Sequence, residues 1–358
     1  MASMRHLHLD PLKREPLLKD QVVPNDDNTP LPVKKAFTDP RGTDNNEDAS
    51  IYFIGTATTV IEWQGLRILT DPNFLHAGDH VHLGPGVTAQ RKTNPAVDLH
   101  ELPPLDCILL SHYHADHFDQ LVEKSLNRNF NIITTPHAKT CLTSDGLKDE
   151  PFQSVHDLDC FESMLLHIDR KDPSNAGGGY GKVPIVKVTG MPGKHVPPGP
   201  LAMANDLLKA VPPTNGWMVE LGNSFKAPTG GDPESMDTGY RIYISGDTLL
   251  VDELKEIPKW LQNEKVDLML IHLGGTTIPS PSVPLVMVTM DAEQGLKLMQ
   301  LVNPDVTIPI HYDDYNVFLS PLSDFKEKVD VEGWSDRVIC LDRGEQYKFK
   351  PKRVVKCI

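Results

Sequence analysis

The chain has 358 residues, with 35 Lys or Arg against 49 Asp or Glu, so its formal net charge is −14 at pH 7. This acidic balance argues against a general nucleic-acid binder, whose surface is basic. Hydrophobic residues make up 39% of the chain, enough for a core. No apolar run reaches the roughly 18 residues of a membrane-spanning helix. The absence of an apolar N-terminal signal and the scattered cysteines predict a cytoplasmic protein with reduced thiols.

The first part of the chain differs from the rest. Residues 1–48 are polar, with scattered Pro, Asp, Asn and Lys and no sustained helical or strand period. We expect them to form an irregular N-terminal arm ahead of one α/β domain over residues 49–358. Three short β-rich runs begin at Ile51. Gln64 and Gly65 separate the last two runs and predict a tight hairpin turn.

Strands and helices alternate along the remainder. Residues 106–111 and 131–135 are apolar runs with polar flanks, the pattern of strands buried on both faces. Asp291 is the expected N-cap of a helix. Two stretches rich in Gly and Pro, 169–183 and 223–239, predict long loops. Further strands are expected at residues 185–190, 217–221, 240–246, 266–275 and 305–311.

The most specific motif is His-x-His-x-Asp-His, which follows the predicted strand at 106–111 and runs from His112 to His117. Imidazole and carboxylate ligands suit zinc and related divalent metals, and the motif contains no thiolate. His112 and His114 can point at one ion from an extended turn, while Asp116 and His117 diverge toward a second. A solvated polar turn without metal is the alternative interpretation.

Each ion needs further ligands from elsewhere in the chain. His195, Asp247 and His311 each follow or end a predicted strand. In α/β enzymes the carboxyl ends of parallel strands meet at the edge where ligands bind. A single histidine at a strand end is more often structural. Together with the motif, however, these three residues are the predicted remaining ligands.

The order of Asp71 in LRILTDP, the HYHADH segment, His195, Asp247 in SGDT and His311 resembles the metallo-β-lactamase-fold hydrolase superfamily over residues 50–345. The resemblance implies a four-layer αββα sandwich. It also implies two divalent metal ions per chain, with zinc favoured. The implied ligands are His112, His114 and His195 for one ion, Asp116, His117 and His311 for the other, and Asp247 as a bridge.

Within the superfamily, the chain is similar to the branch of ascorbate-6-phosphate lactonase and N-acyl-phosphatidylethanolamine phospholipase D. The similarity rests on GTATTVIEWQGLRILTDP, LPPLDCILLSHYHADHFD, SGDT and MDAEQGLKLMQLVNPDVTIPIHY. Many members of that branch carry a His after the first Gly of the opening strand, where this chain has Thr56. His272, in LIHLGGTT, stands where many relatives have another residue, and it is a predicted substrate contact.

The predicted chemistry is hydrolysis by a hydroxide bridged between two metal ions. Asp116 is the residue expected to orient this nucleophile and to pass a proton to the leaving group. Two interpretations of Asp71 stay open. It either accepts a hydrogen bond from a ligand histidine, or it caps the turn before Pro72.

The metal site indicates the reaction better than the substrate. The favoured hypothesis is a lactamase or lactonase that opens a small cyclic amide, ester or carbamate, in detoxification of a xenobiotic such as a benzoxazolinone. One alternative is a phosphodiesterase or phospholipase D-like hydrolase, for which Arg91 and Lys92 offer basic side chains. A metal-free, non-enzymatic scaffold is the other, against which the complete ligand set argues. The expected partner is a small molecule, with no nucleic acid and no membrane span, and the sequence indicates no oligomeric state.

Overall fold

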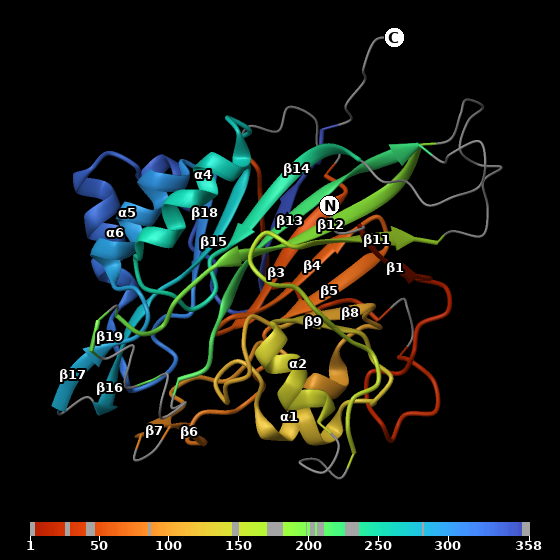
Figure 1. Cartoon of the computed structure of the whole chain (residues 1–358), viewed down its shortest axis with the longest axis horizontal. Helices are drawn as coiled ribbons and strands as arrows, with labels where there is room; N and C mark the ends of the chain where they lie inside the picture. Colours follow the sequence, from red (N-terminus) through yellow and green to blue (C-terminus); the bar gives the residue numbers. More distant parts are fainter. Residues whose placement is uncertain are drawn as a thin grey trace.

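The computed structural model describes residues 4–25, 29–40, 47–84, 87–144, 150–169, 182–197, 199–200, 205, 211–225, 236–280 and 283–352. Two β-sheets face each other, and helices cover the outer side of each (Figure 1). This is the predicted four-layer αββα sandwich, and the predicted fold class is confirmed. None of the helices in these ranges is long and apolar enough to cross a membrane.

The first sheet has seven strands, and their order across the sheet is β1 (Arg5–Leu9), β11 (Ser163–Ile168), β12 (Lys182–Pro192), β13 (Asn215–Phe225), β14 (Asp237–Ile244), β15 (Leu268–His272) and β18 (Val306–Ile310). The second sheet has eight strands, in the order β10 (Val155–Asp157), β9 (Ile132–Thr134), β8 (Cys107–Leu109), β5 (Leu66–Thr70), β4 (Thr58–Trp63), β3 (Ala49–Gly55), β20 (Glu345–Phe349) and β2 (Lys35–Thr38).

Smaller elements complete the fold. The helices are α1 (Gln120–Ser125), α2 (Pro136–Thr143), α4 (Glu256–Leu261), α5 (Ala292–Val302) and α6 (Leu322–Val331), with 3-10 turns at Leu99–Glu101, Asp252–Lys255 and Ser335–Arg337. A three-stranded sheet and a hairpin lie together at one end of the molecule (Figure 1). Their strands are β17 (Val283–Met287), β16 (Gly274–Ser280) and β19 (Phe318–Ser320), and β6 (His80–Gly84) and β7 (Val87–Gln90).

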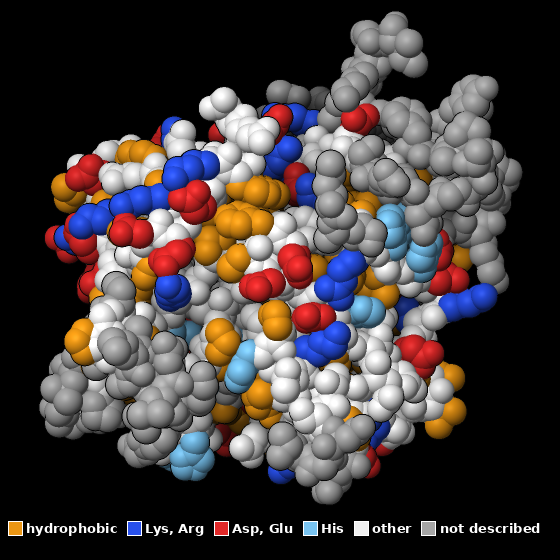
Figure 2. Space-filling view, in the orientation of Figure 1, with side chains coloured by type: hydrophobic (Ala, Val, Ile, Leu, Met, Phe, Trp, Pro, Cys, Tyr) orange, Lys and Arg blue, Asp and Glu red, His pale blue; other side chains and the backbone are white. Residues whose placement is uncertain are grey.

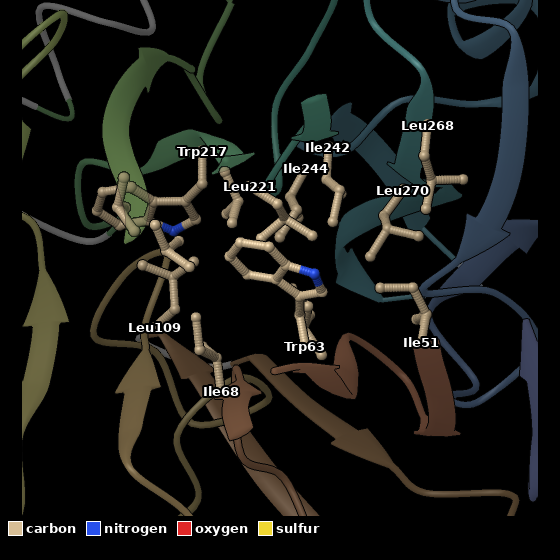
Figure 3. Close-up of a cluster of buried hydrophobic side chains, with 14 of the residues drawn as sticks. Ile51, Trp63, Ile68, Leu109, Trp217, Leu221, Ile242, Ile244, Leu268 and Leu270 are labelled. Atoms are coloured by element: carbon tan, nitrogen blue, oxygen red, sulfur yellow. The ribbon is translucent and has the colours of Figure 1, made fainter. Parts of the chain in front are cut away.

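The main core lies between the two sheets. Trp63 and Leu109 from the eight-stranded sheet face Trp217 and Leu270 from the seven-stranded sheet (Figure 3). Separate apolar clusters join α1 and α2 to one sheet and α4, α5 and α6 to the other. Strands in the middle of the sandwich are therefore apolar on both faces, which explains the continuous apolar runs in their sequences.

Local signals predicted two details correctly. Gln64 and Gly65 form the turn between β4 and β5 with φ angles of 53° and 81°, and positive values at both central positions are typical of tight hairpin turns. Asp291 caps α5, where its side chain accepts a hydrogen bond from the Gln294 amide at 2.9 Å.

The expectation of an irregular N-terminal arm is wrong for two segments. β1 pairs in parallel with β11, and β2 pairs in parallel with β20, so the arm supplies an edge strand to each sheet. Such short strands form because a partner edge is available, and a run of four or five residues carries little periodic signal of its own.

Most of the two predicted long loops, residues 170–181 and 226–235, lies outside the described residues.

The surface in Figure 2 carries mixed charge. Lys and Arg side chains alternate with Asp and Glu over the described part of this face. Ion pairs between residues three apart join Lys255 to Asp252 and Lys259 to Glu256. Among the described side chains of this face, basic and acidic groups are therefore interspersed.

Candidate metal centre

The predicted ligands follow strands that run parallel within their sheets. β5 is parallel to β8 in one sheet, and β14, β15 and β18 are parallel to one another in the other. The loops after these strands carry Asp71, the His112–His117 segment, Asp247 and His311, and His272 ends β15. Polar groups from distant parts of the chain thus meet at the carboxyl ends of the strands.

Four of the predicted ligands form one buried group. Ligand atoms of Asp116, His117, Asp247 and His311 all lie within 4.8 Å of one another. His117 Nε2 is 3.2 Å from Asp247 Oδ2, and His311 Nε2 is 3.9 Å from Asp116 Oδ2. Neither Nε2 atom has a hydrogen-bond partner, although both are buried. These are the residues that the resemblance assigns to the second ion, together with the bridging carboxylate.

The residues assigned to the first ion meet around His112. One group joins His112 with His114 and Asp116, and another joins His112 with His195 and Asp247. His112 Nε2 and His195 Nε2 are only 3.0 Å apart. The structure does not gather His114 and His195 into a single group, and the centroids of their rings are 6.4 Å apart.

The outward-facing ring nitrogens establish which way the histidines present their lone pairs. Each faces an oxygen that can only accept a hydrogen bond, so each carries the proton, and the opposite nitrogen presents a lone pair to the cluster. The pairs are His195 Nδ1 with Val288 O at 2.8 Å, His311 Nδ1 with Leu273 O at 3.0 Å, His117 Nδ1 with Asp71 Oδ2 at 3.0 Å, and His114 Nε2 with Leu83 O at 3.3 Å.

This arrangement fits divalent metal ions. Inward lone pairs from imidazoles, combined with two buried carboxylates, are the donor set that zinc and related metals bind. The unpartnered buried Nε2 atoms of His117 and His311 would be costly without a partner, and a cation supplies one.

Electrostatics favour the protonation states that metal binding needs at both carboxylates and at two of the histidines. Burial raises the pKa of Asp116 and of Asp247, but the neighbouring histidines outweigh it and hold both carboxyl pKa values well below their usual range. Burial lowers the pKa of His195 to about 4 and holds that of His112 well below its usual value. The carboxylates are therefore ionised and these two imidazoles neutral at pH 7. Burial also lowers the pKa of His114 and of His117, but the neighbouring carboxylates outweigh it and raise both above the usual value, so metal binding must displace a proton from each.

Of the two interpretations of Asp71, the structure supports the one in which it accepts a hydrogen bond from a ligand histidine. Besides His117 Nδ1, its carboxylate accepts from the Ser111 amide at 2.7 Å and from Ser111 Oγ at 2.8 Å. Asp71 also has a φ of 34°, which is strained for a residue with a Cβ atom. Strain of this kind persists only where the surroundings hold it, and it concentrates at functional sites.

His272 lies beside the centre and is fully buried. Its Nδ1 is 2.9 Å from Asp247 Oδ1, its Nε2 has no hydrogen-bond partner, and its ring stacks on those of His117 and His311. Sequence reasoning missed Thr289, whose Oγ1 donates to Asp247 Oδ2 at 3.0 Å, because no local pattern marks it. The role of His272 as a substrate contact stays a prediction.

Arg91 is not available to a substrate. Its side chain is only 1% exposed and donates to Thr56 Oγ1 and to the Thr93 carbonyl. The phosphodiesterase alternative counted on this side chain as a contact for the phosphate. The structure therefore removes one of the two basic side chains on which that alternative relied.

Comparison with known proteins finds relatives that are described as metal-dependent hydrolases. A family profile described as "Beta-lactamase superfamily domain" matches residues 50–181, which include the whole His-x-His-x-Asp-His motif. Over these residues the chain is similar to the metallo-β-lactamase superfamily. It is 26% identical over 293 residues to a "UPF0173 metal-dependent hydrolase" of Polynucleobacter asymbioticus, a match that covers 80% of this chain and 83% of the relative. A relative of the same description from Archaeoglobus fulgidus is 25% identical, with 84% and 98% covered.

Solved structures support the fold assignment. An isothiocyanate hydrolase from Delia radicum gut bacteria superposes with a TM-score of 0.58 at 18% identity, covering 83% of this chain and 98% of that chain. Igni18, a metallo hydrolase from Ignicoccus hospitalis, superposes with a TM-score of 0.52 at 19% identity, covering 85% and 99%. At these identities the likeness concerns the fold alone.

Proposed function

We propose that this metal-dependent hydrolase of the metallo-β-lactamase superfamily holds two divalent metal ions and opens a small cyclic amide, ester or carbamate. The observation that carries the proposal is the convergence of buried imidazole lone pairs on two ionised carboxylates. Zinc is the favoured metal, because the donors are imidazole nitrogens and carboxylate oxygens. The proposed ligands are His112, His114 and His195 for one ion, Asp116, His117 and His311 for the other, and Asp247 between them.

The protein residues have distinct roles in the proposed reaction. Two divalent ions, when bound, lower the pKa of water toward about 7 and polarise the substrate oxygen. Asp116, whose Oδ1 lies 2.5 Å from His114 Nδ1, is proposed to take a proton from the attacking water and to pass it to the leaving nitrogen or oxygen. Asp71 keeps the proton of His117 on Nδ1, and Thr289 holds one oxygen of Asp247.

The charges around the centre favour a neutral cyclic substrate over a phosphodiester. Among the described residues, Asp116 and Asp247 form their ion pairs with histidines. Arg91 is enclosed by its own hydrogen bonds. An anionic phosphate would therefore gain little from these protein side chains.

A benzoxazolinone is a cyclic carbamate and belongs to the proposed substrate class, which makes xenobiotic detoxification the proposed role.

The test combines metal analysis with a hydrolysis panel on one sample. The panel holds lactams, lactones, cyclic carbamates, bis-nitrophenyl phosphate and an acylated phosphoethanolamine lipid. We expect about two metal ions per chain and turnover of a cyclic carbonyl compound. Turnover of only the phosphodiesters would favour the alternative hydrolase, and a protein that cannot be loaded with metal would refute the enzyme proposal.

Variants connect the activity to the residues. Asp247→Ala and His311→Ala should each lose at least one metal ion and nearly all turnover. His100→Ala, at an exposed histidine of a 3-10 turn, is the matched control and should keep both. Full metal content and turnover in both ligand variants would show that the ligands are assigned wrongly.

A further inference from the structure

A buried ion-pair network lies behind the metal centre, and no step proposed above uses it. Asp314 is fully buried and its carboxylate accepts hydrogen bonds from Thr93 Oγ1 and from Arg343. The Arg91 guanidinium lies against it, with Nη2 at 3.8 Å from Asp314 Oδ1, and both side chains are closed to solvent. Removing these charges from water costs free energy that their attraction need not repay, so the pair is weak evidence for a purely stabilising role.

One path leads from this network to His311. Asp314 Oδ2 accepts from the Thr56 backbone amide at 2.8 Å, and Arg91 Nη1 donates to Thr56 Oγ1. The Thr56 carbonyl in turn accepts from the His311 amide at 2.7 Å. Thr56 thus has its amide, its hydroxyl and its carbonyl all engaged, and the last of these bonds fixes the backbone of a proposed ligand.

A second path leads to Asp116. Arg91 Nη1 is 3.5 Å from Asn73 Oδ1, and Asn73 Nδ2 donates to the Asp116 carbonyl at 2.7 Å. The same amide group donates to Tyr315 Oη at 2.7 Å. The guanidinium of Arg91 therefore contacts the side chains of Thr56 and Asn73. Thr56 bonds to the His311 backbone through its own carbonyl, and Asn73 bonds to the Asp116 backbone through its side-chain amide.

Backbone strain explains why such support is needed. His311 has a φ of 60° and Thr56 has a φ of 51°, and neither is a glycine. Left-handed backbone at such residues costs on the order of 1–3 kcal/mol each and persists only where surrounding contacts enforce it. The amide of each strained residue is held by a hydrogen bond of the network.

We propose that the buried Arg91–Asp314 pair positions the metal centre, by holding Thr56 and Asn73 so that His311 and Asp116 present their ligand atoms at the correct separation. Arg91 and Asp314 are thus positioning residues that act through Thr56 and Asn73 and touch neither metal nor substrate. The inference rests on the metal centre proposed above.

The test measures metal affinity in Arg91→Met, Arg91→Lys and Thr56→Val. Thr56→Val keeps the shape and the backbone amide but removes the hydroxyl acceptor of Arg91. Affinity for Zn²⁺ is measured by competition with a chromophoric chelator, and the site geometry is followed by the visible absorption of the Co²⁺-loaded protein. Outer partners of metal ligands typically alter affinity by about 10–100-fold. We expect a loss of about 10-fold for one of the two ions in Arg91→Met and Thr56→Val, a changed Co²⁺ spectrum, and partial recovery in Arg91→Lys.

A matched control separates positioning from stability. Arg14 pairs with Asp106 at 2.9 Å, and their side chains are 5% and 2% exposed, so this second buried pair resembles the first. It lies beside the β4–β5 turn, where Arg14 donates to the Gly65 carbonyl. Arg14→Met should lower the free energy of unfolding while leaving both metal affinity and the Co²⁺ spectrum at their wild-type values.

The outcomes are distinct. If Arg91→Met and Thr56→Val lose only stability, as Arg14→Met does, and bind both ions as the wild type does, the network is a structural ion pair and the inference is wrong. If Arg91→Met does not fold, Thr56→Val decides by the same two measurements. A wild-type protein that binds no divalent ion would overturn the proposed centre and this inference with it.

Discussion

Replacement of Asp71 by asparagine tests how the protein sets the protonation of a metal ligand. In the wild type, Asp71 Oδ2 accepts from His117 Nδ1, so the His117 proton lies on Nδ1 and the Nε2 lone pair faces the cluster. Asp71→Asn places an NH₂ group at that position, because Oδ1 must remain the acceptor for the Ser111 amide. His117 Nδ1 must then accept, and its proton moves to Nε2, where it opposes metal binding.

The magnitude follows from counting hydrogen bonds. The asparagine can remake all three contacts of Asp71, so the metal-free protein should change in unfolding free energy by under about 1.5 kcal/mol. Metal affinity should fall by about 10–100-fold, as for other partners of metal-bound histidines. Asp71→Ala leaves buried donors without acceptors at about 1–3 kcal/mol each, so it should lose stability as well as affinity.

The assay is urea unfolding of the metal-free protein beside chelator competition for Zn²⁺. Asp106→Asn is the matched control, since Asp106 is a buried carboxylate that pairs with Arg14 rather than with a ligand. It should lose stability and keep its metal affinity. Wild-type affinity in Asp71→Asn, with normal folding, would refute the tautomer argument.

Four further predictions can be checked. A metal ion present at 100 times its dissociation constant stabilises the folded protein by about 2.7 kcal/mol, so removal of that metal with a chelator should lower the unfolding free energy by this amount. An unchanged urea midpoint after chelation would contradict a resident metal. Trp217→Ala should cost about 3–5 kcal/mol in urea unfolding, because Trp217 fills the space between the sheets. His272→Ala should change substrate affinity or preference with near-wild-type metal content, whereas loss of metal would make His272 a ligand. Burial raises the pKa of Asp157, but the bond from Lys139 outweighs it and lowers the pKa below its usual value. The stabilisation that Asp157 contributes is therefore present above about pH 4 and lost as the pH falls through the lowered folded-state pKa. Asp157→Asn should be less stable than the wild type at pH 7 and converge with it in acid, and a constant difference would refute this.

Local features of the sequence determined much of the fold and part of the centre. The His-x-His-x-Asp-His motif puts its donors within one turn, so its chemistry is readable without a structure. The turn at Gln64 and Gly65 and the cap at Asp291 are equally local, since backbone conformation or one nearby hydrogen bond decides each. The positions of His195 and His311 after strands could be predicted, because buried strands appear in the sequence as continuous apolar runs.

Contacts between distant segments were decided by the tertiary structure. β1 and β2 are strands because β11 and β20 offer them an edge more than 150 residues away in the chain. The sequence offered Arg91 as a basic side chain for a phosphate, yet packing encloses it against Asp314, 223 residues further on. The partners of the centre, such as Thr289, are single side chains or backbone carbonyls without a pattern of their own. Periodicity records which face of an element is buried, whereas the pairing of distant elements depends on the whole packed core.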